Sequence, residues 1–229
     1  MMTIRAQADH LVDLGLAELA GTTPERLREL ATGLEAEASR DGAAASGDGA
    51  KSQGDHAESQ PVLAVHPSLV DPRRLVGLLE RAGKPGFVVV DMTDLDEFVP
   101  LDGLDVPDAP LYLLRDVRRG DEMRNRSPDE ALPKITGEGR SPLTISEGIS
   151  WLLQQPAQLE PGSCFMCIGS RRPKRSGRGG HDARTPALWI SGGTGRDGAA
   201  NTGAPKLGWC WAGNRHTWLG FASAAGRAG

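Results

Sequence analysis

The sequence predicts an α+β fold, with N-terminal helices, a flexible linker and then a mixed sheet that ends in an antiparallel β meander. Leucines recur at helical spacing in the first 38 residues, and four short apolar runs separated by Gly, Pro and Asn follow Ser163. With 229 residues, 38% of them hydrophobic, the chain is long enough for one sizeable core. We therefore expect an N-terminal helical hairpin at 1–38, a flexible linker at 39–60 and a single α+β domain at 61–229.

The N-terminal helices are predicted from leucine periodicity and from their end signals. Residues 7–21 form an amphipathic pattern that ends at Gly21. Residues 22–38 form a second one, in which Thr23 is placed to cap the helix and Pro24 occupies its first position. The segment that follows is dense in Gly, Ser, Ala and Asp, so we expect it to lack fixed structure.

The middle of the chain is predicted to alternate strands and helices. Asp71 and Gly83 are typical of a helix start and stop, and the Thr144–Glu147 spacing fits a capping box. The expected elements are a short strand or turn at 61–70, a helix at 71–83, a buried central strand at 85–92, a strand at 109–117 and a helix at 144–155.

The C-terminal part is predicted to be all β, with sequence neighbours paired antiparallel. The four strands are expected at 163–170, 186–192, 206–213 and 217–224. Gly213 and Asn214 would supply the positive φ angles of the last hairpin turn. Trp209 and Trp211 would share one face of a strand and Trp218 would lie on its partner, so the tryptophans are expected in the core and in cross-strand pairs.

The charge of the chain is unevenly distributed. The net charge is −4, yet residues 161–229 contain ten Lys or Arg against two Asp, a net charge of +8. This surplus could meet the acids of residues 1–160, or it could meet a phosphate-bearing partner. Within it, residues 171–185 are too polar and glycine-rich to order themselves without a ligand or a covering surface.

A glycine motif suggests a nucleotide-binding loop, but the residues around it do not fit one. Glycines 193, 195 and 198 satisfy G-x-G-x-x-G, but Gly203 and Pro205 break the helix that a dinucleotide fold needs, and Ala199 stands where a Walker loop has Lys. We expect a long hairpin loop and no cofactor, with an anion held by its amides and Arg196 as the alternative.

The three cysteines could bind zinc. Cys164, Cys167 and Cys210, with His181 or His216, would supply four ligands. Residues three apart in a strand point to opposite faces, however, so we expect buried thiols and no metal.

The candidate catalytic and ligand-binding residues lie in the polar loop near 118–130 and in the C-terminal strands. The dense mixed charges of that loop could form only a solvated surface, or they could line a cleft. The candidate acids and bases are His216, Asp197, Asp121 and Glu122. The candidate ligand-binding residues are Arg119, Arg124, Asn125, Arg196, Trp209, Trp211, Asn214, Arg215 and Trp218.

These residues are compatible with three classes of function. The first hypothesis is a binding protein for a phosphate-bearing ligand, either a nucleotide-like small molecule or RNA. The second is a hydrolase or transferase that acts on an anionic small molecule. The third is a structural protein that binds a protein partner through its N-terminal helices. The sequence has no apolar run near 18 residues and no signal peptide pattern, so we expect a cytoplasmic protein without a membrane partner.

Five motifs are similar to those of an uncharacterised actinobacterial family, one of the domains of unknown function. They are RRGDEMRN, SPDEALP, SPLTISEGISWLL, RTPALWISGGTGRDG and APKLGWCWAGNRHTWLGFASAAGR. The likeness runs from about Pro61 to the last residue and includes the first helix. It implies no activity for the chain.

Overall fold

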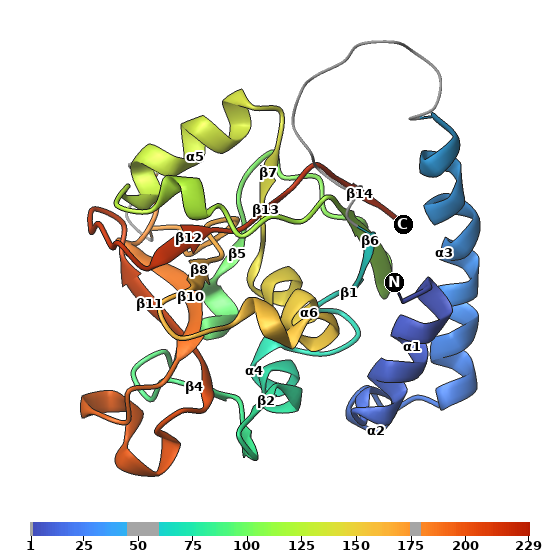
Figure 1. Cartoon of the computed structure of the whole chain (residues 1–229), viewed down its shortest axis with the longest axis horizontal. Coiled ribbons are helices and arrows are strands. Elements are labelled where there is room, and N and C mark those ends of the chain that lie inside the picture. The colour runs from blue at the N-terminus through green and yellow to red at the C-terminus, as the bar shows by residue number, and fades with distance from the viewer. Residues whose placement is uncertain (1, 45–59, 175–179) are drawn as a thin grey trace.

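The computed structural model describes residues 2–44, 60–174 and 180–229, and it confirms the predicted α+β class. N-terminal helices pack against one side of the molecule, and a helix lies between the two larger sheets (Figure 1). Among the described residues, no helix has the length and apolar character needed to cross a bilayer.

Three helices open the chain: α1 (Ile4–Asp13), α2 (Leu16–Leu19) and α3 (Pro24–Ala44). The predicted single helix over 7–21 is wrong, because Gly15 adopts a left-handed φ of 88° and separates α1 from α2. The second helix begins at Pro24 as predicted, but it continues to Ala44, beyond the predicted start of the linker. The rest of the predicted linker, residues 45–59, lies outside the described residues.

A three-stranded sheet lies beside these helices, with the order β1 (Val62–Val65), β6 (Leu111–Arg115) and β14 (Gly226–Ala228). Both pairings are antiparallel, so the last residues of the chain complete this sheet. α3 packs on α1 and on β6, and buried residues of the helices and both sheets form one hydrophobic cluster. The N-terminal helices therefore share a core with the body of the protein.

The larger sheet has five strands in the order β12 (Leu219–Phe221), β8 (Cys164–Met166), β10 (Arg184–Ile190), β11 (Pro205–Trp211) and β4 (Phe87–Val88). The antiparallel pairs β8–β10 and β10–β11 confirm the prediction for those strands. The predicted hairpin between the last two strands is wrong. β4 occupies the second edge of β11, so β12 crosses to the far edge and pairs parallel with β8. Gly213 and Asn214 are not among the residues with positive φ.

Helix α6 (Ile145–Gln154) lies between the two sheets and is buried along its whole length (Figure 1). Its capping box, in which Thr144 and Glu147 bond each other's backbone amides, confirms the predicted helix. Helix α5 (Pro128–Gly137) was not predicted, although Ser127 and Glu130 form the same kind of box. The polar composition of the surrounding stretch concealed this helix.

The predictions for residues 71–92 are largely wrong. The chain forms only one turn of helix, α4 (Pro72–Leu75), a 3-10 turn, and the short hairpin of β2 (Glu80–Arg81) and β3 (Lys84–Pro85). Gly83, expected to end a helix, takes part in the hairpin turn with a φ of 71°. The expected central strand is the short edge strand β4, and Val90 beyond it is 72% exposed. Two further strand pairs are β5 (Val99–Pro100) with β9 (Ser170–Arg171), and β7 (Ser141–Pro142) with β13 (Ser223–Ala224).

Candidate functional site

Cys210 and His216 lie in direct contact at the end of β11. The His216 Nε2 atom is 2.8 Å from the Cys210 Sγ atom. The chain folds back between them through a turn in which the Asn214 amide donates to the Trp211 carbonyl. The carbonyl of His216 accepts from the Asn125 amide at 2.7 Å, which fixes the returning chain against the segment before α5. A thiol and an imidazole are thus held at hydrogen-bonding distance.

The surroundings of this pair set its protonation state. Burial lowers the pKa of His216 below its ordinary value of 6.5, so the ring is neutral at neutral pH. The ring lies against the indole of Trp218, with 5.1 Å between centroids. The Asn214 side-chain amide lies 3.8 Å from the Cys210 sulfur. The sequence identified His216 and Asn214 but missed Cys210, because that residue was interpreted as one of three buried thiols.

The tryptophans of this region are less buried than predicted. Trp209 and Trp211 share a face, as expected, and their rings meet edge to face at 4.6 Å. Trp211 is nevertheless 49% exposed and Trp218 is 36% exposed, so the expectation of core positions is wrong for both. β12 does not pair with β11, and the chain between these strands consequently stays at the surface.

The polar loop before α5 is held together by its own charges. Asp121 accepts from Arg119 at 2.7 Å and lies 3.2 Å from Arg124. Arg124 also donates to the Ser163 hydroxyl. Glu122 and Asn125 are exposed. These arginines are therefore neutralised by a carboxylate of the same loop.

Asp197 and Arg196 are also engaged within the protein. Asp197 is buried, lies 2.5 Å from the Lys206 ammonium and accepts from the Ser191 hydroxyl. Arg196 pairs with Asp91 at 2.7 Å and lies over the Trp209 ring. The predicted hairpin loop is present, since Ile190 pairs with Pro205 at its base. Asp197 is thus committed to a buried lysine rather than to a site shared with His216.

Most of the C-terminal positive charge is paired internally. The structure describes eight of the ten Lys and Arg residues between 161 and 229, and six of these form ion pairs with acids. They are Arg172, Arg184, Arg196, Lys206, Arg215 and Arg227. Five of the six pair with an acid from residues 1–160. The surplus charge therefore serves mainly to join the C-terminal part to the acidic remainder.

Arg171 and Lys174 are the two described basic residues of this part without an ion pair to a described acid, and both line one cavity. This cavity of about 340 Å³ is called the Arg171 cavity below. Its remaining lining residues are Leu101, Asp129, Leu132, His181, Ala183 and Ala212. Arg171 is only 7% exposed, and one guanidinium nitrogen donates to the Asp182 carbonyl at 2.9 Å. Its buried Nε atom has no hydrogen-bond partner among the described residues.

None of the sequence-predicted site residues lines this cavity. The sequence did contain a signal for it, because residues 171–185 are too polar to order without a ligand or a covering surface. Burial lowers the pKa of Arg171 below its ordinary value, the charges of Asp129 and Asp182 oppose that effect, and the guanidinium remains charged across the physiological range. The cavity therefore combines a buried cation, an exposed Lys174, a histidine and the Asp129 carboxylate with apolar walls.

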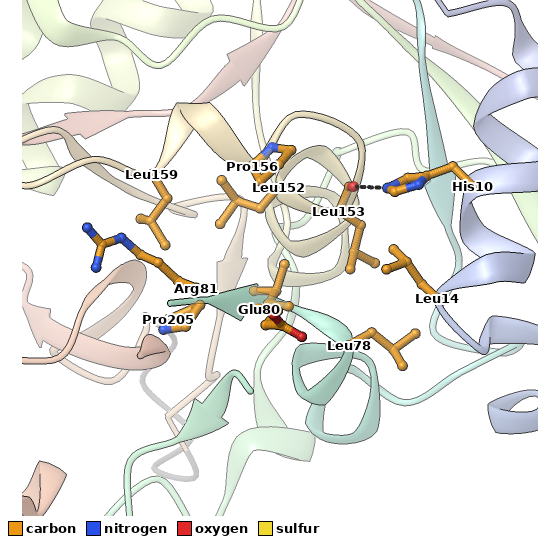
Figure 2. Close-up of a pocket in the computed structure, with 11 residues that line it drawn as sticks. His10, Leu14, Leu78, Glu80, Arg81, Leu152, Leu153, Pro156, Leu159 and Pro205 are labelled. Atoms are coloured by element: carbon orange, nitrogen blue, oxygen red, sulfur yellow. Dashed lines mark hydrogen bonds between the residues drawn. The ribbon is translucent and has the colours of Figure 1, made fainter. Parts of the chain in front are cut away.

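A second cavity, of about 370 Å³, lies between the N-terminal helices and α6. Figure 2 shows Leu14, Leu78, Leu152 and Leu153 around it. Two of its polar residues are already bonded: His10 Nε2 lies 3.0 Å from the Leu153 carbonyl, and Arg81 donates to the Gly203 carbonyl. Its third polar residue is Glu80, so the cavity offers apolar surface and an acid rather than a site for an anion.

The cysteines do not assemble into a metal centre in the described part of the chain. No group of three or more His, Cys, Asp and Glu side chains there is arranged to hold an ion. Cys164 and Cys167 are buried, and burial raises the pKa of both thiols. Cys210 contacts His216 instead.

Comparison with known proteins places the chain in one family. A family model described as "Family of unknown function (DUF5701)" matches residues 10–229. The chain belongs to this family. No curated protein and no solved structure gives a significant match. The expected family resemblance is thus confirmed as membership of a family of unknown function, and membership of DUF5701 assigns no activity.

Proposed function

We propose that the protein binds a small phosphate-bearing ligand in the Arg171 cavity. The observation that carries this proposal is the distribution of the C-terminal charge. Six of the eight described cations form ion pairs with acids, and the two that form none with a described acid line the same cavity. An anionic ligand would give Arg171 and Lys174 the counter-charge that acids give the other six cations.

Arg171 is suited to an anion because of its burial. Among the described residues no carboxylate lies at ion-pair distance from Arg171, and only the longer-range charges of Asp129 and Asp182 oppose the cost of its burial, so a counter-charge beside it would be stabilising. The bond to the Asp182 carbonyl fixes the guanidinium plane, and the Nε atom remains without a partner. A planar guanidinium presents paired N–H groups that match two phosphate oxygens.

The other lining residues indicate the size and character of the ligand. A cavity of about 340 Å³ fits a small molecule rather than a polymer. Lys174 and His181 supply further positive or donor groups, while Asp129 would accept from a hydroxyl or amino group. Leu101 and Leu132 provide apolar contact. A phosphate monoester of a small hydroxylated molecule satisfies all of these features.

Thermal unfolding of the purified chain tests this proposal. Inorganic phosphate, a small phosphate monoester and a short RNA are added in turn to the wild type, Arg171→Gln, Lys174→Met and the control Arg74→Gln. Arg74 is an exposed arginine outside the Arg171 cavity. Binding to the native state raises the Tm with ligand concentration. We expect the two phosphates to raise it in the wild type and in Arg74→Gln.

The cavity variants separate this proposal from its alternatives. A lost bond to a charged group is worth about 1.5–3 kcal/mol, so Arg171→Gln should need about 10- to 100-fold more phosphate for the same shift. Lys174→Met should have a smaller effect, because its side chain is exposed. A shift that Arg171→Gln leaves unchanged would contradict the proposal. Stabilisation by RNA alone would favour the nucleic-acid hypothesis instead.

A further inference from the structure

We infer that Cys210 is a nucleophilic thiol with His216 as its base, and that the pair reacts with activated carbonyl groups such as esters and thioesters. This inference concerns a different set of residues from the Arg171 cavity and does not depend on what that cavity binds. The reaction that the contact between the thiol and the imidazole would catalyse is acyl transfer.

The geometry of the pair is set by the fold. Cys210 is held in the β10–β11 ladder, opposite Thr185. His216 is held from two sides, by the bond between its carbonyl and the Asn125 amide and by the Trp218 ring. The two reactive atoms, Sγ and Nε2, are 2.8 Å apart. A nucleophile and base at hydrogen-bonding distance form the minimal unit of covalent catalysis by cysteine.

The neutral state of the His216 ring permits it to take the thiol proton. Because burial lowers the pKa of His216, its ring is neutral and its Nε2 atom is able to accept the thiol proton. The Asn214 amide faces the sulfur at 3.8 Å and would donate to the thiolate that forms. The acids outside the pair are engaged elsewhere: Glu130 pairs with Arg215, and Asp121 pairs with Arg119.

Thr185 provides an independent indication of a ligand. It lies directly across the ladder from Cys210, and cross-strand partners in an antiparallel pair project from the same face with neighbouring Cβ atoms. Thr185 is fully buried, yet its hydroxyl has no hydrogen-bond partner in the described structure. Such a hydroxyl is available to donate to an oxygen that carries negative charge during attack at a carbonyl carbon.

The reaction is balanced without any further reagent except water. The Cys210 sulfur forms a bond to the carbonyl carbon while its proton moves to His216 Nε2. The bond from that carbon to the leaving oxygen or sulfur then breaks, and the leaving group takes the proton from Nε2. Water then attacks the carbonyl carbon of the acyl-cysteine and gives one proton to His216 Nε2. The carbon–sulfur bond breaks, the Cys210 sulfur takes that proton back, and the carboxylic acid leaves. The partly exposed Trp218 ring beside the base favours an apolar acyl group.

The test is the reactivity of Cys210 towards two electrophiles, iodoacetamide and p-nitrophenyl acetate. Mass spectrometry of the full chain identifies which cysteine is modified, and Cys164 and Cys167 serve as buried internal controls. We expect Cys210 to react at neutral pH about 10-fold or more faster than cysteine in a short peptide, because an adjacent base contributes about 100- to 10,000-fold to such transfers. The ester should release one equivalent of nitrophenolate in a burst.

Variants assign the effect to His216. His216→Gln should slow modification of Cys210 at neutral pH at least about 10-fold and should change how the rate depends on pH, because the base is lost. The matched control His66→Gln changes a half-buried histidine whose ring bonds Ser68, and it should leave the rate unchanged. A Cys210 that reacts no faster than the peptide in the wild type would overturn the inference, whether or not the variants fold. An unchanged rate and pH profile in a folded His216→Gln would also overturn it.

Discussion

Lys206 and Asp197 form an ion pair in the interior of the protein, with 2.5 Å between the ammonium nitrogen and the carboxylate oxygen. Both side chains are buried, and the ammonium lies 4.4 Å from the centre of the Trp189 ring. Burial lowers the pKa of Lys206, and the bond to Asp197 opposes that effect. The pair lies at the base of the β10–β11 loop and holds the Asp197 carboxylate inside the fold.

Asp197→Asn should lower the free energy of unfolding by about 3–5 kcal/mol, because it leaves the Lys206 charge buried without a counter-ion. The matched control is Asp91→Asn, which removes the partner of Arg196 at the surface, where both side chains are about one-third exposed. That change should cost less than about 1 kcal/mol. Urea denaturation of the two variants measures both values, and equal losses would contradict the buried role of Asp197.

Arg227→Met should destabilise the packing of the last strand, β14. Arg227 makes two bonds to the buried Glu147 carboxylate, at 2.6 and 2.8 Å, and Tyr112 donates to the same carboxylate at 2.9 Å. Loss of the guanidinium leaves a buried charge with fewer partners, so unfolding should become about 3–5 kcal/mol easier. Tyr112→Phe should cost less, about 1.5–3 kcal/mol. Hydrogen exchange should show β14 losing protection in Arg227→Met before the large sheet does.

Gly148→Ala should destabilise the protein by about 1–3 kcal/mol, because α6 is too tightly packed for a methyl group there. A Cβ atom at this position would lie 2.4 Å from the Cys167 sulfur and 3.1 Å from Leu188. Gly33 in α3 is the control, since a Cβ atom there meets nothing within 4 Å. Gly33→Ala should stabilise by up to about 1 kcal/mol through helix propensity. Thermal unfolding shifts of opposite sign are the expected result.

The stability of the protein should fall in acid partly through Asp94. Bonds from Arg184 lower the pKa of Asp94 below its ordinary value of 3.8. A carboxyl group with a lowered folded-state pKa contributes its full stability above the ordinary value and loses it as the pH falls through the folded value. The difference in unfolding free energy between the wild type and Asp94→Asn should therefore shrink in strong acid. Asp96→Asn, which removes an exposed carboxylate close by in the sequence, is the control variant for the same measurement.

Local signals predicted those elements whose formation depends on neighbours in the sequence. The capping box of Thr144 and Glu147 and the proline at the start of α3 are such cases. The β10–β11 hairpin joins strands that follow one another along the chain. The sequence could not reveal that β12 would pair with β8, because that choice depends on β4, more than 100 residues earlier, occupying the edge of β11.

The candidate site was predicted in part for the same reason. His216 and Asn214 were identified from their place near a turn, and the contact with Cys210 follows from how that turn folds back. Arg171 and Lys174 could not be singled out among ten basic residues. These two residues stand out only once the structure shows that Arg184, Arg196 and the other described cations are paired with acids.

A crystal structure of the protein grown with inorganic phosphate tests the central claim most directly. The proposal predicts an anion in the Arg171 cavity, with the Arg171 Nε atom and the Lys174 ammonium donating to its oxygens, and an empty cavity in Arg171→Gln under the same conditions. A cavity that remains free of anion in the wild type, or an anion that binds equally well in Arg171→Gln, would contradict the proposal.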